Sequence, residues 1–136
     1  MLRVTRAAAA ALRQACDAAS PREACGTLVG RRGADVAIAL DALPARGAAA
    51  RGAFEIPGHE LRRMSAWAGN RGLEIVAVFH SHPSGAPELS GLDRDALRHA
   101  VWPWVVATRA AGGTGEISLA AYAPGDARPL EVRIER

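Results

Sequence analysis

Residues 73–79, LEIVAVF, constrain the fold of this chain more than any other segment. The run is almost entirely apolar, is rich in β-branched residues and is bounded by a glycine and a histidine. It is far shorter than the roughly 20 residues of a membrane span. A short apolar run of this kind is typical of a strand that is buried on both faces. We therefore expect a sheet with this strand at its centre and with helices covering both faces.

The flanking segments show alternating strand and helix patterns. Thr5 and Ser90 are suitable N-caps, and Pro57 can begin a helix. Residues 24–31 and 35–40 are expected to pair as a hairpin around Gly33. The order predicts a single α+β domain over residues 1–136, with a mixed β-sheet flanked by helices. The expected helices are 6–18, 57–69 and 90–100, and the remaining strands are 2–4, 54–56, 104–108, 117–123 and 130–135.

Composition narrows the class of protein. The chain has 136 residues with 17 basic and 14 acidic side chains, and its arginines are scattered, so no nucleic-acid face is expected. Two cysteines without a CxxC spacing favour a reduced, cytoplasmic setting, and no apolar run suggests a membrane partner. The Arg- and Ala-rich start has the composition of a transit peptide. We interpret it as the first strand and helix, and any targeting role stays open.

The segment HSHPSGAPELSGLD, residues 80–93, contains the residues that indicate chemistry. His80 and His82 are two apart at the end of the central strand, so both imidazoles can lie on one face. Asp93 falls in the first turn of a helix capped by Ser90, after a loop that allows the chain to fold back. Two imidazoles and a carboxylate leave a fourth tetrahedral position for water, as catalytic zinc requires. Zinc lowers the pKa of such a water to about 7.

Hydrolysis also needs a proton acceptor outside the metal ligands. Glu23, between a helix end and a strand, is the candidate for the general base, and Ser90 could donate a hydrogen bond to a developing oxyanion. Each residue also has a structural interpretation. Ser90 and Asp93 fit a capping box, Glu23 could face solvent, and His80 and His82 could be polar residues at a strand end.

Together these residues resemble the JAMM (MPN+) metallopeptidase motif. The resemblance rests on His80, His82, Ser90 and Asp93 at the family spacing and on Glu23 in EACGTLVG, and it covers essentially the whole chain. It implies one Zn²⁺ per chain bound by the two histidines and the aspartate. It also implies Glu23 as acid/base, Ser90 as the residue that stabilises the tetrahedral intermediate, and a cytidine-deaminase-like fold.

The compact length resembles the small bacterial members of this family. The resemblance implies cleavage after the C-terminal Gly-Gly of a small ubiquitin-like protein, a ThiS- or CysO-like sulfur carrier. An alternative is a bacterial deubiquitinase-like deconjugase of ubiquitin-like modifiers. A second alternative is a non-catalytic MPN interaction module, which would bind no zinc. The sequence leaves open whether the protein forms a homodimer, and which residue it releases.

Several other side chains are assigned no chemical role. The histidines outside the motif lack partners at a ligand spacing, and the cysteine beside the glutamate motif is interpreted as core. The tryptophans are expected to pack in the core or at its edge, although a binding platform at 102–104 stays open. These residues are His59, His99, Cys25, Trp67, Trp102 and Trp104.

Overall fold

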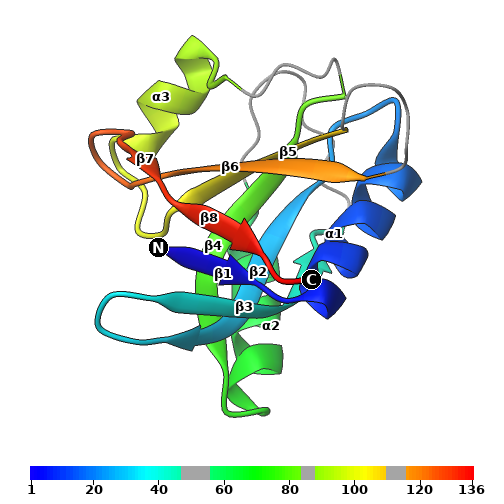
Figure 1. The fold of residues 1–136 in the computed structure, drawn as a ribbon, viewed down its shortest axis with the longest axis vertical. Helices are drawn as coiled ribbons and strands as arrows, with labels where there is room; N and C mark the ends of the chain where they lie inside the picture. Colours follow the sequence, from blue (N-terminus) through cyan, green and yellow to red (C-terminus); the bar gives the residue numbers. More distant parts are fainter. Residues whose placement is uncertain (47–55, 84–87, 110–115) are drawn as a thin grey trace.

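The computed structural model describes residues 1–46, 56–83, 88–109 and 116–136. In this part of the chain one eight-stranded mixed sheet is accompanied by three helices (Figure 1). The elements are β1 (Leu2–Val4), α1 (Arg6–Ala19), β2 (Cys25–Arg32), β3 (Ala37–Pro44), α2 (Gly58–Gly69), β4 (Glu74–Ser81), α3 (Gly91–Leu97), β5 (Trp104–Arg109), β6 (Ile117–Tyr122), β7 (Pro129–Leu130) and β8 (Val132–Ile134).

The apolar run forms β4, which lies in the middle of the sheet as predicted. The strand order is β7-β6-β5-β4-β2-β3-β1-β8. Every residue of β4 after Glu74 is buried. β4 pairs antiparallel with β2 and parallel with β5, so its carboxyl end lies beside the carboxyl end of β5. This pairing brings the residues that follow β4 to one edge of the sheet.

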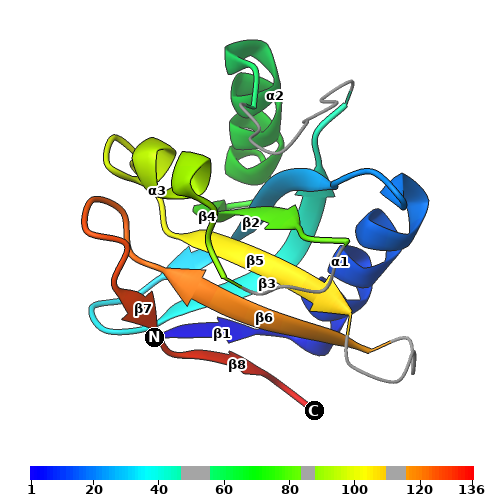
Figure 2. The ribbon, with the colours of Figure 1, turned by 90° about the horizontal axis from the view of Figure 1, so that it is seen from above.

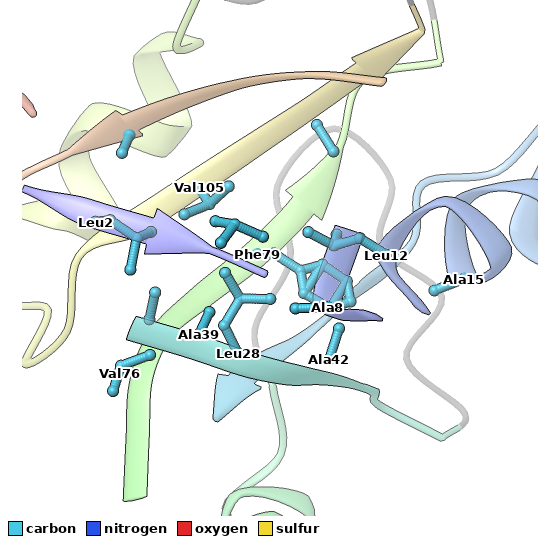
Figure 3. Packing of buried hydrophobic residues seen from close by; sticks show 14 residues of the cluster. Leu2, Ala8, Leu12, Ala15, Leu28, Ala39, Ala42, Val76, Phe79 and Val105 are labelled. Carbon is cyan, nitrogen blue, oxygen red and sulfur yellow. The ribbon is translucent and has the colours of Figure 1, made fainter. Parts of the chain in front are cut away.

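The two faces of the sheet carry different helices. α1 covers one face, where Leu12 packs against Phe79 and the aliphatic side chains around it (Figure 3). On the other face, Leu97 of α3 packs with Val106, and Ala68 of α2 packs with Ile75. Figure 2 shows α2 and α3 on the same side of the central strands. The expected mixed sheet flanked by helices is therefore confirmed.

The N-terminal residues belong to this core. Thr5 caps α1 by accepting a hydrogen bond from the Ala8 amide at 3.2 Å, as predicted. Leu2 and Val4 of β1 are buried together with the inner face of α1. This packing supports the interpretation of the N-terminal segment as the first strand and helix of the domain. No helix in the described ranges is long and apolar enough to cross a membrane.

Some predicted boundaries were wrong. The expected strand 35–40 is too short, because residues 41–44 continue β3 and pair with β2. The expected strand 130–135 is two short strands, because β7 pairs with β6 whereas β8 pairs with β1 on the other side of the sheet. The third helix ends at Leu97 rather than near residue 100. Most of the expected strand 54–56 lies outside the described residues.

A buried carboxylate attaches α2 to the chain that leaves β3. Glu60 is 3% exposed, and its carboxylate accepts hydrogen bonds from the Arg63 guanidinium and from the Arg46 backbone amide. The hydrogen bonds from Arg63 and Arg46 lower the pKa of Glu60 to about 2, from an ordinary value of 4.5. The ionised form is therefore the one that the fold stabilises.

This contact predicts a specific acid sensitivity. Because the folded pKa is depressed, the contribution of Glu60 to stability is present above about pH 4.5 and is lost as the pH falls towards about 2. We expect Glu60→Gln to lower the melting temperature at neutral pH. We also expect its loss of stability over this acid range to be smaller than that of the wild type. Thermal unfolding followed by circular dichroism measures both, and parallel curves for the two proteins would contradict the assignment.

Candidate metal centre

The centre begins where β4 ends. His80 is buried in the strand and His82 follows directly after it, held by a hydrogen bond from its backbone amide to the Ala107 carbonyl at 3.0 Å. The Nε2 atoms of the two imidazoles lie 3.0 Å apart. The predicted convergence of these histidines is therefore present in the structure.

Asp93 completes the cluster from the first turn of α3. The Ser90 hydroxyl accepts from the Asp93 amide, and the Asp93 carboxylate accepts from the Ser90 amide, both at 3.0 Å. This capping box fixes the carboxylate. Its Oδ2 atom lies 3.4 Å from the Nε2 atoms of both His80 and His82. The predicted capping box is thus present, and the same carboxylate lies within the group formed with His80 and His82.

The cluster has the size and the chemistry of a zinc site. Zinc bonds of about 2.0–2.2 Å at tetrahedral angles place neighbouring ligand atoms roughly 3.3–3.6 Å apart. The three separations here are 3.0, 3.4 and 3.4 Å, close to those of three corners of such a tetrahedron. Imidazole nitrogen and carboxylate oxygen are both common zinc ligands. The three side chains therefore fit one divalent ion.

The environment favours the charge state that a ligand needs. Burial of Asp93 raises the pKa of its carboxyl, but hydrogen bonds from His80 and the Ser90 amide outweigh this effect and bring the pKa to about 2. The carboxylate is therefore ionised at neutral pH. The side chains of His80 and Asp93 are 1% and 2% exposed, whereas that of His82 is 12% exposed. The cluster consequently reaches solvent through His82.

Glu23 lies two residues before β2 and close to Cys25. Cys25 of β2 is paired with His80, and the Ser81 amide donates to the Ala24 carbonyl at 2.9 Å. Continuing this antiparallel register by one more residue places Glu23 opposite His82, and directly opposed residues point to the same face.

The carboxylate of Glu23 has one buried oxygen, Oε2, that accepts no hydrogen bond from the described residues. Burial, followed by the nearby charges of Glu23 and Glu60, raises the pKa of Cys25 to about 11, so the Cys25 thiol is neutral. The Glu23 Oε2 atom therefore keeps its acceptor lone pairs available with respect to the described residues.

Ser90 lies at the rim. It is exposed, and its hydroxyl oxygen accepts from the Asp93 amide, so its own proton can still be donated to another group. The structure therefore brings His80, His82, Asp93 and Ser90 together by direct contacts. Extending the register of β2 and β4 from Cys25 to Glu23 would bring Glu23 to the face that carries His82.

Residues 5–121 match the family model for prokaryotic homologs of the JAB domain. The chain belongs to the JAB-domain family. No curated protein matches it significantly. The fold of this JAB protein agrees with the family assignment, because the whole chain aligns with solved structures that include JAB1/MPN and JAMM proteins.

A protein from Desulfitobacterium hafniense, known from a solution structure, aligns with a TM-score of 0.82 and 18% identity, covering 100% of this chain and 94% of that one. A JAB1/MPN domain protein from Archaeoglobus fulgidus aligns with a TM-score of 0.62 and 16% identity, covering 100% and 98%. A structure described as JAMM, a metalloprotease-like zinc site in the proteasome and signalosome, aligns with 0.60 and 14%, covering 100% and 99%. At these identities the likeness establishes the JAB/MPN fold.

One side of the centre in this JAB protein is formed by a tryptophan that no sequence pattern connected with the histidines. Trp104 is buried on β5, and its ring packs edge-on against the His80 imidazole, with centroids 5.4 Å apart. The contact depends on the parallel pairing of β4 with β5, which no local pattern reveals. The predicted core position of Cys25 is confirmed, and His59 and His99 are exposed, as expected for residues without a role.

Proposed function

We propose that this protein is a zinc-dependent metallopeptidase that cleaves after the C-terminal Gly-Gly of a small ubiquitin-like protein of the sulfur-carrier type. The observation that carries the proposal is the triangle of His80, His82 and Asp93, whose dimensions and chemistry suit one zinc ion. When bound, zinc supplies a nucleophile at neutral pH by acidifying a coordinated water. The resemblance to the JAMM zinc site supports the choice of zinc.

The remaining residues would handle protons and charge. Glu23 accepts the proton of the attacking water through its buried Oε2 atom, which accepts no hydrogen bond from the described part of the chain, and passes the proton to the leaving amine. Ser90 donates its hydroxyl proton to the oxygen that becomes negative on the scissile carbonyl. The capping box keeps that hydroxyl next to Asp93, so the donor lies within the same turn as a metal ligand.

Access to the cluster supports a glycine-rich substrate. Because His80 and Asp93 are almost fully buried and His82 is only partly exposed, a scissile bond must approach the sheet edge closely. Glycine allows such an approach because it has no side chain and adopts backbone conformations closed to other residues. An extended C-terminal tail ending in Gly-Gly meets this requirement, and a strand edge could hold it by β-addition.

The substrate prediction can be tested directly. We expect the enzyme to remove the residue that follows Gly-Gly from a carrier with a C-terminal Gly-Gly-Cys, and to leave unstructured casein largely intact. Replacing Gly-Gly by Ala-Ala in the same carrier should slow cleavage by at least about tenfold, because each added methyl crowds a closely packed site. Mass spectrometry of the three incubations measures the result.

The same experiment separates the alternatives. Rapid casein digestion with an intact carrier would contradict the substrate class. Cleavage confined to a carrier joined to a lysine side chain would instead indicate a deconjugase. Absence of both zinc and cleavage would favour an interaction module.

A further inference from the structure

Ser81 lies between the two histidines but has no place in the chemistry proposed above. Successive side chains of a strand point to opposite faces, so Ser81 faces α1 whereas His80 faces the cluster. Ser81 is 5% exposed and lines a cavity of about 40 Å³ with Cys16 of α1. A polar side chain in this position needs hydrogen-bond partners.

The Ser81 hydroxyl binds the segment that precedes β2. Its oxygen accepts from the Ala24 backbone amide at 2.8 Å. The Cys16 thiol lies across the same cavity; burial raises its pKa, and the nearby Ser81 hydroxyl opposes this rise. The Ser81 amide also donates to the Ala24 carbonyl at 2.9 Å. Both backbone polar groups of Ala24 are thus bound by the same residue.

We propose that Ser81 is a positioning residue for Glu23, an inference that rests on the proposed role of Glu23 as the base. Glu23 precedes Ala24 and lies before the first residue of β2, where the ladder between β2 and β4 has not yet begun. Ser81 is the neighbour of both His80 and His82 in the chain. Its two hydrogen bonds attach Ala24 to β4, the strand that carries His80. Ser81 therefore sets the distance between the base and the ligands from the opposite face of the sheet.

Replacement of Ser81 by alanine tests this role. The hydrogen bond from the Ser81 amide to Ala24 is retained, so only the bond from the Ala24 amide to the hydroxyl is lost. A catalytic group misplaced by about 1 Å can cost roughly a hundredfold in rate. We expect Ser81→Ala to lower kcat by about ten- to a hundredfold, with KM within about twofold of the wild type. Zinc content should stay unchanged.

Two further variants provide controls. Ser81→Thr keeps the hydroxyl, and the adjoining cavity of about 40 Å³ has room for its methyl group, so kcat should return to within a few-fold of the wild type. Cys16→Ala enlarges the same cavity but leaves the bond to Ala24 intact, so kcat should change less than about twofold. Threonine failing to restore the rate, or Cys16→Ala matching Ser81→Ala, would overturn the proposal.

The decisive comparison repeats Ser81→Ala in a Glu23→Gln background. If Ser81 acts through Glu23, the second substitution should produce no further loss of kcat, because coupled residues are not additive. A full additional loss would show that Ser81 acts through the metal ligands or the fold, and would contradict the inference.

An amide-exchange measurement keeps the inference testable without turnover. We expect hydrogen exchange at the Ala24 amide to be at least about tenfold faster in Ser81→Ala than in the wild type, because this amide loses its acceptor. Exchange at the Val78 amide, which lies on β4 like Ser81, should stay unchanged. If the wild type cleaves no substrate, the proposed function fails, and unchanged exchange at Ala24 would separately overturn the role of Ser81.

Discussion

The purified protein is expected to hold about one zinc ion per chain, and His82→Ala to hold less than about a tenth of that amount. Loss of a residue that only contacts a ligand already costs about 10–100-fold in metal affinity, so loss of a ligand should cost more. His82 is the most informative position because its side chain reaches solvent, whereas removal of His80 would also leave a hole in the core. Elemental analysis after dialysis gives the stoichiometry.

Stability provides a second measurement of the same site. A ligand present at about 100 times its dissociation constant stabilises the native state by about 2.7 kcal/mol. A chelator should therefore lower the melting temperature of the wild type but leave that of His82→Ala unchanged. Asp93→Asn should also lose zinc while its amide oxygen still accepts from Ser90, which keeps the cap of α3.

Matched controls on nearby residues exclude a general effect of removing a titratable group. His99 is exposed beyond the end of α3, and Asp95 is exposed on α3 itself. His99→Ala and Asp95→Ala should both retain full zinc content. Normal zinc content in both His82→Ala and Asp93→Asn would contradict the assignment of the ligands.

Local patterns were sufficient for those parts of the fold that depend on local chemistry. The apolar run of β4 and the caps at Thr5 and Ser90 were predicted because burial on both faces and helix capping leave direct signs in composition. The end of β3 was missed because Asp41 and Pro44 are typical of loops. In the structure, Asp41 accepts from the Ala42 amide, and Pro44 ends the strand, where its missing N–H matters least.

Other features depend on strand pairing, which residue order does not disclose. β7 and β8 are separated by a single residue yet lie at opposite ends of the strand order. A single residue can connect them because the sheet curls, which brings β6 and therefore the β7 end close to β8. In the same way, the spacing of His80, His82 and Asp93 was visible in the sequence. The contact of Trp104 with His80 and that of Ser81 with Ala24 depend instead on how β4 pairs with β5 and β2.

Glu23→Gln is expected to keep zinc and the fold while lowering kcat by at least about a hundredfold, the usual size of a general acid–base contribution. Glutamine has nearly the same shape and keeps a carbonyl oxygen, so it can occupy the same position before β2. It cannot accept a proton at neutral pH. If Glu23 receives the proton of the attacking water and returns it to the leaving amine, both steps fail together. The loss should therefore appear in kcat and in kcat/KM alike, because the interaction exists only in the transition state.

Glu88 supplies the matched control for this prediction, because it is an exposed glutamate that lies two residues before Ser90. Glu88→Gln should turn over within about twofold of the wild type. Steady-state cleavage of the Gly-Gly carrier, together with zinc content and melting temperature for each variant, separates a missing proton acceptor from a missing ion or a loosened fold. Near-normal turnover by Glu23→Gln combined with a large loss in Glu88→Gln would move the base to the α3 side of the centre. In that case the buried Oε2 atom of Glu23, which has no hydrogen-bond partner among the described residues, would have to be explained by its structural surroundings and not by proton transfer.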